Sequence, residues 1–393
     1  MREPVMIEYA AHATSALVNG EVRLTIGSDA LEVVALFDSA RIPFADINAI
    51  GLADYTVSIK TDEGDYSLSR LGNWCRPFYE ALYDSYNKAV LRSLFIKDTP
   101  LFTANGVYKF VENGINSSGS APIHIYENSV VALPPDLSAR RVPLCFVGGM
   151  DKQELELTLK LDMDERYAYS RLGYDTAMFA ATVEKQIRQL REKSLNAVKA
   201  IDTSLSMTQS SQIAGLMSQG AAAQYRRLAS IAPSFTAAID NRIAGTCTAE
   251  YYNAFKEMSD PGQIYIGFKE SVAEEESEEA LPCQFVFWMI VPSPDGKYAA
   301  VEFAEEDSAT FVYRTGGDFE VFARKLNRAL EAIDFKREII WMSDEQLSAS
   351  DNAYYRMAAK RTAALRYIRS NFSGRIIHSN VESWKKRLSD LWK

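Results

Sequence analysis

One short pattern occurs three times in this chain, and it constrains the fold more than any other feature. Each copy has an arginine, any residue and a glycine, followed by a phenylalanine eight residues after the arginine. A pattern that recurs in the same local setting indicates a repeated structural unit. The copies consist of Arg70, Gly72 and Phe78, of Arg171, Gly173 and Phe179, and of Arg314, Gly316 and Phe322.

The residues around each copy predict the same local structure. A strand-like run precedes each arginine, and apolar residues continue beyond each phenylalanine in steps of four, which places them on one face of a helix. We therefore expect a strand, a short turn and a helix with one buried stripe, and we expect the glycine to allow a positive φ or a close strand-helix approach. The stripes are Phe78, Leu82 and Tyr86, then Phe179, Val183 and Ile187, then Phe322, Leu326 and Leu330.

The first two copies share further landmarks, which the third lacks. The sequence Val-Val-Ala-Leu at 33–36 recurs at 130–133, and the Ser-Ala-Arg run that leads to a proline at 39–43 recurs at 138–143. The Ser-Arg-Leu-Gly segments lie 101 residues apart and the prolines lie 100 apart. Two homologous units of about 100 residues are the simplest interpretation.

Alternation of apolar and polar residues predicts the strands of these two units, and a continuous apolar stripe predicts the helix that closes each of them. An Asp-Glu-Gly turn at 62–64 is expected to join two strands as a hairpin. For the first unit the strands are 22–26, 31–36, 42–47, 55–60 and 66–68, with a helix at 74–94; for the second they are 107–111, 123–126, 130–133, 142–147 and 155–161, with a helix at 175–201.

The remainder of the chain changes character twice. Residues 202–258 are rich in Ala, Ser and Gln and predict helices at 210–219, 221–231 and 233–258, with breaks at Gly220 and Pro233. Strand character returns afterwards, and the glutamate-rich stretch 270–280 is expected to be a solvated hairpin loop. The predicted later elements are strands at 264–266, 285–291, 298–303, 311–313 and 338–342, and helices at 351–370 and 379–392.

These patterns divide the chain into five parts, in keeping with the two to four domains expected for 393 residues. The predicted parts are a first module at 1–95, a second module at 96–201, a helical segment at 202–258, a degenerate third module at 259–335 and a basic, mostly helical tail at 336–393.

The first two units resemble the pleckstrin-homology-like (PH-like) and GRAM-like domains of bacteria. The resemblance rests on Arg41-Ile42-Pro43-Phe44-Ala45-Asp46-Ile47, which is similar to a strand common in those domains, and on the segment 67–72 that leads into the closing helix. It covers residues 1 to about 200 as two copies and 259–335 as a degenerate third. It implies an α+β fold of tandem modules, each a small bent antiparallel sheet or partly open barrel capped by a C-terminal helix.

The same resemblance bears on ligands. PH domains that bind phosphoinositides usually carry several basic residues in the loop that joins their first two strands. We identify the corresponding loops as 27–30 and 112–120, which contain no Lys or Arg. Phosphoinositide headgroup recognition at that place is therefore disfavoured, and since this fold hosts lipid binders, peptide binders and scaffolds alike, the resemblance does not choose a function.

The repeated arginine permits two interpretations. Counting back by twos places Arg70 and Arg171 at the rim of the apolar face, close to a helix N-terminus, where an anion site is one possibility. The other is a structural arginine whose stem packs on the core while its head pairs with a carboxylate or carbonyl. Recurrence in three different units favours the structural interpretation.

Composition gives no sign of a membrane span, a metal centre or an enzyme. The longest apolar run, 285–291, is far shorter than the roughly 20 residues of a membrane helix. The N-terminus lacks the basic and apolar pattern of a signal peptide, so we expect a cytoplasmic location. The four cysteines form no Cys-x-x-Cys pair, and the three histidines, His12, His124 and His378, lie in different segments. We predict no catalytic residue, no cofactor and no metal ligand.

Charge is the strongest functional asymmetry. Residues 356–393 contain ten basic side chains against two acidic ones, a net of +8, whereas the whole chain carries −9. A basic amphipathic helix is expected around Trp384, Lys385, Lys386 and Arg387, which we predict as a partner or membrane contact. The tail can dock on an acidic surface of its own chain, such as the loop at 270–279, or on a second copy. It can also lie on an anionic membrane or contact nucleic acid.

The function we predict is that of a non-enzymatic binding or scaffolding protein. A protein partner or self-association is the favoured interaction. The alternative is peripheral binding to an anionic membrane surface through the C-terminal helix, and nucleic acid is disfavoured. The three copies of the arginine-glycine pattern are interpreted as structural joints.

Overall fold

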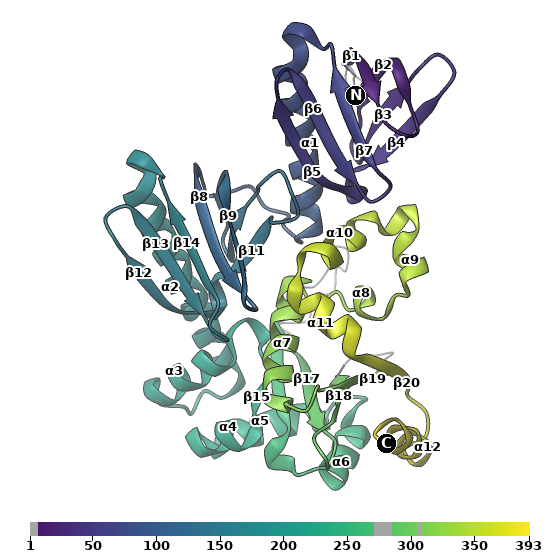
Figure 1. Ribbon diagram of the computed structural model, residues 1–393. Coiled ribbons are helices and arrows are strands. Elements are labelled where there is room, and N and C mark those ends of the chain that lie inside the picture. The colour runs from purple at the N-terminus through teal and green to yellow at the C-terminus, as the bar shows by residue number, and fades with distance from the viewer. Residues whose placement is uncertain (1–6, 271–284, 305–308) are drawn as a thin grey trace, which may run out of the picture. The chain divides into compact units, whose positions relative to one another are not determined.

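The computed structural model of the chain describes residues 7–270, 285–304 and 309–393 (Figure 1). The chain divides into two compact units. Unit 1 comprises Met1–Pro143, Val147–Val183 and Met342–Ala363, and unit 2 comprises Leu144–Phe146, Glu184–Trp341 and Ala364–Lys393.

Module 1 is a curled seven-stranded antiparallel sheet followed by a helix. In space the strands follow the order β4-β3-β2-β1-β7-β6-β5, so the first and last strands of the module pair in the middle of the sheet. The elements are β1 (Glu8–Thr14), β2 (Asn19–Ile26), β3 (Ala30–Val34), β4 (Ser39–Pro43), the 3-10 turn η1 (Phe44–Asp46), β5 (Ile47–Ala53), β6 (Thr56–Thr61), β7 (Asp65–Ser69), η2 (Gly72–Trp74) and α1 (Cys75–Ser93).

Module 2 repeats this plan element by element. Its strand order, β11-β10-β9-β8-β14-β13-β12, is that of module 1, and both modules have a register shift at the start of the fifth strand. The elements are β8 (Phe102–Glu112), β9 (Ile115–Ile125), β10 (Ser129–Ala132), β11 (Arg140–Pro143), η3 (Leu144–Phe146), β12 (Val147–Lys152), β13 (Glu156–Leu161), β14 (Arg166–Ser170), η4 (Gly173–Asp175) and α2 (Thr176–Ile201).

The predicted helical stripes form the cores of the modules. Phe78, Leu82 and Tyr86 on α1 are fully buried against the sheet, and Phe179 and Val183 on α2 are buried in the same way. Fully burying one such side chain stabilises the fold by about 1.5–3 kcal/mol. An α+β architecture of curled antiparallel sheets with helices is thereby confirmed, as are the two closing helices, the hairpin turn at 62–64 and two repeating units.

The repeated joint has a backbone geometry that explains its glycine. Gly72, Gly173 and Gly316 all have positive φ, at 56°, 61° and 70°, as expected. Arg70 and Arg171 also have positive φ, at 57° and 54°. Because each arginine itself has a positive φ, the alternation of inward and outward side chains ends before it. Both arginine side chains are exposed, so the prediction that they lie at the rim of the apolar face is wrong.

Unit 2 has a six-stranded antiparallel sheet in which spatial order equals chain order, β15 to β20. Its helices lie on both faces. The strands are β15 (Ala223–Gln224), β16 (Tyr265–Glu270), β17 (Phe285–Pro292), β18 (Tyr298–Phe303), β19 (Ala309–Arg314) and β20 (Phe372–Ile377); the helical elements are α3 (Met207–Leu216), η5 (Ser218–Gly220), α4 (Tyr225–Ile231), α5 (Pro233–Ala244), α6 (Ala249–Met258), η6 (Pro261–Gln263), α7 (Phe319–Ala332), α8 (Glu338–Trp341), α11 (Ala363–Asn371) and α12 (Val381–Leu391).

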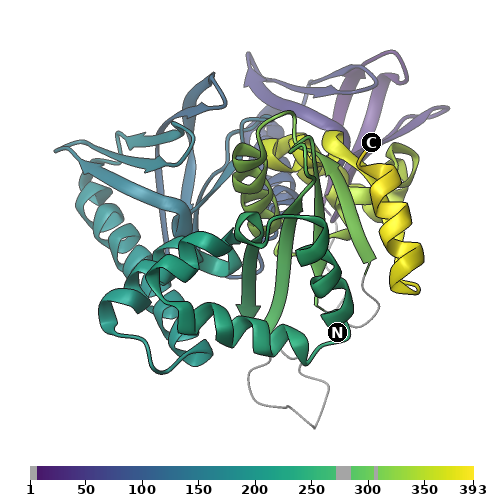
Figure 2. The same ribbon diagram turned by 90° about the horizontal axis from the view of Figure 1, so that it is seen from below.

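The two faces of this sheet have separate cores. Phe287, Met289 and Val291 pack with α4, α5 and α6, which Figure 2 shows in teal along one side of the green strands. Trp288, between them in sequence, faces the other way, where its ring contacts Phe335 just after α7. Because both faces are covered, β17 is a nearly continuous apolar run rather than an alternating one.

The third copy of the pattern lies in this different setting. The strand β19 leads into α7 through Arg314 and Gly316, and Phe322 is buried, as predicted. However, the described residues of 259–335 supply four strands of this sheet, and the two edge strands come from outside that range. The boundaries predicted for a third module therefore do not enclose this sheet, and its strand order is not that of modules 1 and 2.

Several local predictions are corrected by the structure. Strand β1 was not predicted, because its buried positions are Tyr9 and two small alanines. Its presence makes residues 15–18 the loop between the first two strands, while the predicted loop at 27–30 consists of the turn 27–29 between β2 and β3 and the first residue of β3. Residues 15–18 also contain no basic residue. The loop at 112–120 is mostly strand, with a turn at Asn113 and Gly114 between β8 and β9.

The tail also differs from its prediction. Residues 338–341 form the helix α8 rather than a strand, because an apolar run this short carries no period that separates the two. The single helix predicted at 351–370 is interrupted at Thr362, and β20 was not predicted. The glutamate-rich segment, apart from Glu270, lies outside the described residues. The tail elements in unit 1 are α9 (Asp344–Ser348), η7 (Ser350–Asn352) and α10 (Ala353–Arg361).

Candidate functional site

The predicted contact helix α12 is docked on unit 2 through its apolar stripe. Trp384 is fully buried, and its rings meet Tyr251 and Phe255 of α6 at 5.1 and 4.9 Å between centroids. Its indole N–H donates to Thr310 Oγ1 at 2.8 Å. A tryptophan held in this way is not available to a membrane or a partner while the helix is docked.

The basic side chains of α12 divide into two groups. Lys385 is paired with Glu257 at 2.8 Å, and that hydrogen bond raises the pKa of the lysine. Lys386 and Arg387 are exposed, and among the described residues neither forms an ion pair. Of the four residues predicted as a contact, these two alone face outward with their charges uncompensated in the described chain.

Beneath α12 lies a buried polar chain that the sequence did not predict. Glu302 is fully buried on β18, where it accepts a hydrogen bond from Thr310 at 2.5 Å and lies 3.1 Å from His378 Nε2. The imidazole stacks on Tyr251 at 3.7 Å. A carboxylate that orients an imidazole is a frequent catalytic arrangement. Here the ring face is covered by Tyr251, so the contacts hold β20 and α12 against β18 and β19.

The first part of the basic tail docks elsewhere, on module 1. Arg356 on α10 pairs with Asp46 of η1 at 2.7 Å, and both side chains are largely buried. Lys360 pairs with Asp62 and donates to the carbonyl of Ala45 at 3.0 Å. The interpretation that the tail docks on acidic groups of its own chain is confirmed for α10 and, through Lys385, for α12.

Arg361 is the most buried cation of this contact. Its guanidinium is fully buried beside α1, where it donates to the hydroxyl of Tyr86 at 2.6 Å and to the carbonyl of Met357 at 3.3 Å. Met357 belongs to the apolar core of module 1. Burying a charge costs several kcal/mol unless hydrogen bonds compensate. The contact between α10 and module 1 is therefore a built packing interface rather than a surface ion pair.

Modules 1 and 2 contact each other through one loop of module 2. Residues 133–139, between β10 and β11, lie against β5 and α1 of module 1. The amide of Ile50 on β5 donates to the carbonyl of Pro135 at 2.8 Å, and Ala49 bridges Asp136. We name residues 133–139 the docking loop and the β5 edge with the neighbouring face of α1 the acceptor face.

Side chains complete the contact. Leu133 is 1% exposed and belongs to the same core cluster as the residues of module 1. The hydroxyl of Tyr83 on α1 donates to the Leu133 carbonyl. Burial raises the pKa of Tyr83 to about 12, so this hydroxyl is protonated at neutral pH and remains a donor. The docking loop covers the β5 edge. Without this cover, the edge would be open to pairing with another strand.

The corresponding turn of module 1 has no such contact with the residues that the structure describes. It joins β3 to β4 at residues 35–38, begins within the Val-Val-Ala-Leu sequence of 33–36 and carries Leu36 and Phe37 at its tip. Leu36 is 84% exposed and Phe37 is 91% exposed. Exposed apolar side chains grouped in one place commonly mark an interaction site.

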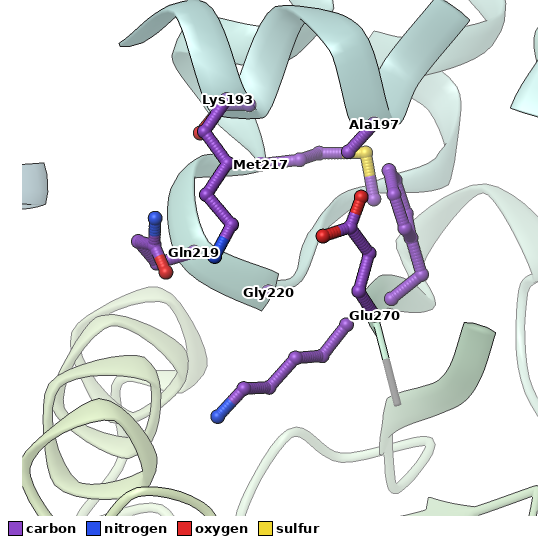
Figure 3. A pocket seen from close by; sticks show the side chains of 9 residues that line it. Lys193, Ala197, Met217, Gln219, Gly220 and Glu270 are labelled. Carbon is purple, nitrogen blue, oxygen red and sulfur yellow. The ribbon is translucent and has the colours of Figure 1, made fainter. Parts of the chain in front are cut away.

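Unit 2 also has a shallow pocket of about 530 Å³, part of which is open to solvent. Figure 3 shows Lys193 of α2 extending toward Gln219 and the carboxylate of Glu270 pointing toward Met217. The second lysine of the lining, Lys269, is turned to Asp334, at 2.8 Å. The polar groups thus point in different directions instead of converging on a shared point.

The glycine of the pocket wall has a structural reason. Gly220 has a φ of 83°, and a Cβ there would lie 3.0 Å from the ring of Phe335. Its carbonyl accepts the indole N–H of Trp288 at 2.8 Å. The pocket therefore lies where η5 approaches β16 closely. This close packing of the two elements accounts for the glycine in the pocket wall.

The remaining predicted residues are structural or apart from one another. Arg70 pairs with Glu21 at 3.0 Å, with both side chains exposed, so its head finds a carboxylate as predicted, but its stem does not pack on the core. His12 lies 3.5 Å from the same glutamate. His124 lies 3.2 Å from the Tyr126 hydroxyl, and burial lowers its pKa. Within the described residues, no three His, Cys, Asp or Glu side chains form a metal site.

Comparison with known proteins adds little. No family model matches this chain, and no curated protein matches it. Among solved structures it is similar to a chain from "Structure of the Spt16D Pob3N heterodimer", at 12% sequence identity over 42% of this chain and 88% of that chain, with a TM-score of 0.18. A likeness at this TM-score supports no conclusion about function. In the described part of the chain, no helix is long and apolar enough to cross a membrane.

The sequence missed the two contacts that matter most for function. The docking loop contains Pro134 and Pro135 where module 1 has Phe37, and this difference between otherwise matching segments was the available signal. The landing place of α10 had no signal, because Asp46 and Tyr86 lie some 300 residues before the basic side chains that contact them.

Proposed function

We propose that this protein is a non-enzymatic binding or scaffolding protein built from two tandem PH-like modules. The observation that supports this most is the pair of identical strand orders, each closed by one C-terminal helix, which matches the architecture implied by the resemblance at Arg41 to Ile47. The fold alone selects no ligand, so the proposal rests on which surfaces the modules leave open.

The absence of converging reactive groups supports a binding role over catalysis. The pocket lining diverges, the His378 ring is covered by Tyr251, and the described residues present no metal-binding cluster. The exposed apolar tip at Leu36 and Phe37 offers instead a surface for a protein. We propose the cytoplasm as the location, as the sequence predicts.

Capture from an extract of the source cell tests the binding role. The full chain, immobilised through its N-terminus, is expected to recover a defined protein, and Leu36→Ser with Phe37→Ser is expected to lose it. Tyr55→Ser is the matched control, since Tyr55 is 82% exposed on a different turn of the same module. Recovery of no protein above an empty support, in repeated extracts, contradicts the proposal.

A peripheral membrane role through α12 remains the second candidate because Lys386 and Arg387 are exposed. Burial of Trp384 argues against it, since an interfacial helix uses its apolar face to enter the bilayer. Co-sedimentation with vesicles of phosphatidylcholine and phosphatidylserine separates the two. We expect no binding, and binding that disappears in Lys386→Glu with Arg387→Glu favours the membrane role.

A further inference from the structure

We propose that the turn at residues 35–38 of module 1 docks on module 2 of a second copy of this chain, in the way that the docking loop of module 2 docks on module 1 within one chain. This inference rests on the proposed binding role and names its partner. Each copy then carries one donor turn, at residues 35–38, and one acceptor edge, on β12.

The donor turn is the counterpart of an element whose binding partner is known. The turn joins the same two strands as the docking loop, although the pairings of Ala30 with Pro43 and of Ser129 with Pro143 place Val34, rather than Leu36, at the position of Leu133. Leu133 is 1% exposed because it contacts module 1, whereas Leu36 is 84% exposed. The turn of module 1, at 35–38, is three residues shorter than the docking loop, at 133–139, and Phe37 supplies apolar surface at its tip.

The apolar surface extends beyond the tip. Leu17, in the loop between β1 and β2, is 56% exposed, and Val34 is 38% exposed. The register pairs Thr14 with Asn19 and Val34 with Ser39, so these two turns lie at the same end of the sheet. The donor surface therefore comprises Leu17, Val34, Leu36 and Phe37.

Charge at this end favours a protein over an anionic membrane. Asp38 follows Phe37 directly, and Glu63, in the hairpin at 62–64, lies at the same end because Thr14 pairs with Ser67, whereas the neighbouring Asp62 is already paired with Lys360. Carboxylates are repelled by an anionic bilayer, whose surface potential is negative. An apolar tip with acidic neighbours fits a protein surface instead.

The acceptor edge is the β12 edge, the counterpart of the β5 edge. Ile50 pairs with Ile59 and Met150 pairs with Leu159, so Met150 holds the position whose amide, in module 1, donates to the docking loop. Strand β12 lies at the end of its sheet. Within the described chain the only backbone ladder of β12 is the one with β13.

The acceptor edge is also accessible. Gly148 is exposed, Gly149 and Met150 are half-buried, and a Cβ at Gly149 would meet only the Lys160 side chain, at 3.8 Å. An edge strand whose outward amide, here that of Met150, has little side-chain cover accepts an added segment of backbone. One donor and one acceptor on different surfaces make a heterologous, head-to-tail contact, which produces chains or rings rather than closed twofold dimers.

A contact made by one turn is small, so we expect a dissociation constant between about 1 µM and about 1 mM. Sedimentation velocity of the full chain over this range is expected to show a weight-average mass that grows with concentration. Leu36→Ser with Phe37→Ser is expected to weaken association at least about tenfold. Tyr55→Ser, on an exposed tyrosine elsewhere in module 1, is expected to leave it unchanged.

The acceptor is tested by Met150→Pro, which removes the amide at an outward position of an edge strand where proline is tolerated. Met150→Lys is the second variant in case the proline disturbs β12, since a lysine on an edge opposes strand addition. Each acceptor variant alone is expected to be monomeric. Mixed with the Leu36→Ser, Phe37→Ser chain, which keeps its acceptor, either is expected to form one-to-one dimers and nothing larger.

A wild-type chain that stays monomeric at the highest concentration overturns the inference. So does undiminished association of the donor variant, or failure of the mixed variants to pair when the wild type associates. If the wild type is monomeric but extract capture yields a protein, this inference fails and the proposed function stands. If neither occurs, both fail.

Discussion

Modules 1 and 2 have the same strand order, the same left-handed joint and the same closing helix, yet their equivalent turns have opposite surroundings. Leu133 is buried against the neighbouring module, and Leu36 is exposed at a free tip. The core residues are alike in the two modules. Surface residues differ, as where module 1 has Tyr83 and module 2 has Glu184, and these differences decide what each surface contacts. Repetition of a fold therefore leaves its contacts free to diverge.

The comparison also holds for the surface beside each closing helix. In module 1 the helix α1 offers the Tyr86 hydroxyl to the buried Arg361 of α10. Module 2 has Ile187 at the corresponding place, which cannot accept a hydrogen bond. The basic tail is thereby directed to module 1, although both modules offer a capped sheet.

The largest expected effect comes from truncating the buried leucine. Leu133→Ala should lower the free energy of unfolding by about 2–5 kcal/mol, because it leaves a cavity between the modules. Leu36→Ala, at the tip of the equivalent turn, should change it by less than about 0.5 kcal/mol, as for other exposed positions. Urea unfolding followed by circular dichroism measures both. Equal losses of stability in the two variants would contradict the difference between the modules, since they would indicate that both leucines have equivalent surroundings.

The second-largest loss of stability is expected when the buried Arg361 guanidinium loses its hydrogen-bond acceptor. Tyr86→Phe takes away the hydroxyl that accepts from Arg361, and an unsatisfied buried donor costs about 1–3 kcal/mol. We expect a lower unfolding midpoint and faster proteolysis within 342–363. Tyr174→Phe is the control, because this tyrosine is fully exposed and its hydroxyl is free to bind water. Unchanged proteolysis in Tyr86→Phe would show that α10 does not depend on this contact.

The joints of the two modules should respond alike. Gly72→Ala and Gly173→Ala should each cost about 1–2 kcal/mol, because both glycines have positive φ and alanine is strained there. Gly215→Ala is the control: Gly215 lies within α3 with open space around it, so alanine should stabilise the helix slightly. Thermal unfolding measures all three. A neutral result at either joint would argue against the shared left-handed turn.

Acidification gives the smallest effect and again concerns module 1 alone. Burial raises the pKa of Asp62, but hydrogen bonds from Lys360 and Asn48 and the charges of Lys360 and Arg356 outweigh it, so the pKa in the folded protein lies below the ordinary value of 3.8. A lowered folded pKa stabilises the protein above the unfolded value, and this contribution is lost as the pH falls through the folded value. Release of α10, measured by proteolysis below about pH 4, should be steeper in the wild type than in Asp62→Asn. Identical pH profiles of the two proteins would show that the ion pair between Asp62 and Lys360 does not hold α10 on module 1.

Much of the fold could be predicted from the sequence, since period and repetition are local properties. The helix over 75–93, the hairpin before it and their copies in module 2 follow from alternation and from steps of four. Strand β1 was missed because its inward positions include Ala11 and Ala13, which give little apolar contrast. Arg70 was misplaced because parity fails at a residue with positive φ.

The candidate sites were less predictable, because each depends on segments far apart in the chain. The sequence alone suggests that Trp384 is an exposed membrane anchor, whereas in the structure it is covered by α6 and donates a hydrogen bond to Thr310. His378 and Glu302 are 76 residues apart and meet only because β20 adds to the sheet beside β19. Amphipathic character indicated correctly that α12 covers something, but not whether the covered surface belonged to the same chain.

Amide hydrogen exchange at single-residue resolution tests the central claim most directly, because the β5 and β12 edges offer equivalent amides to the two turns. Ile50, which donates to Pro135, should be protected at every protein concentration. Met150 should exchange rapidly in dilute protein and become protected as the concentration rises, and this change should vanish in Leu36→Ser with Phe37→Ser. A Met150 amide whose exchange does not depend on concentration, or an Ile50 amide that exchanges as fast as Met150 does in dilute protein, would contradict the account.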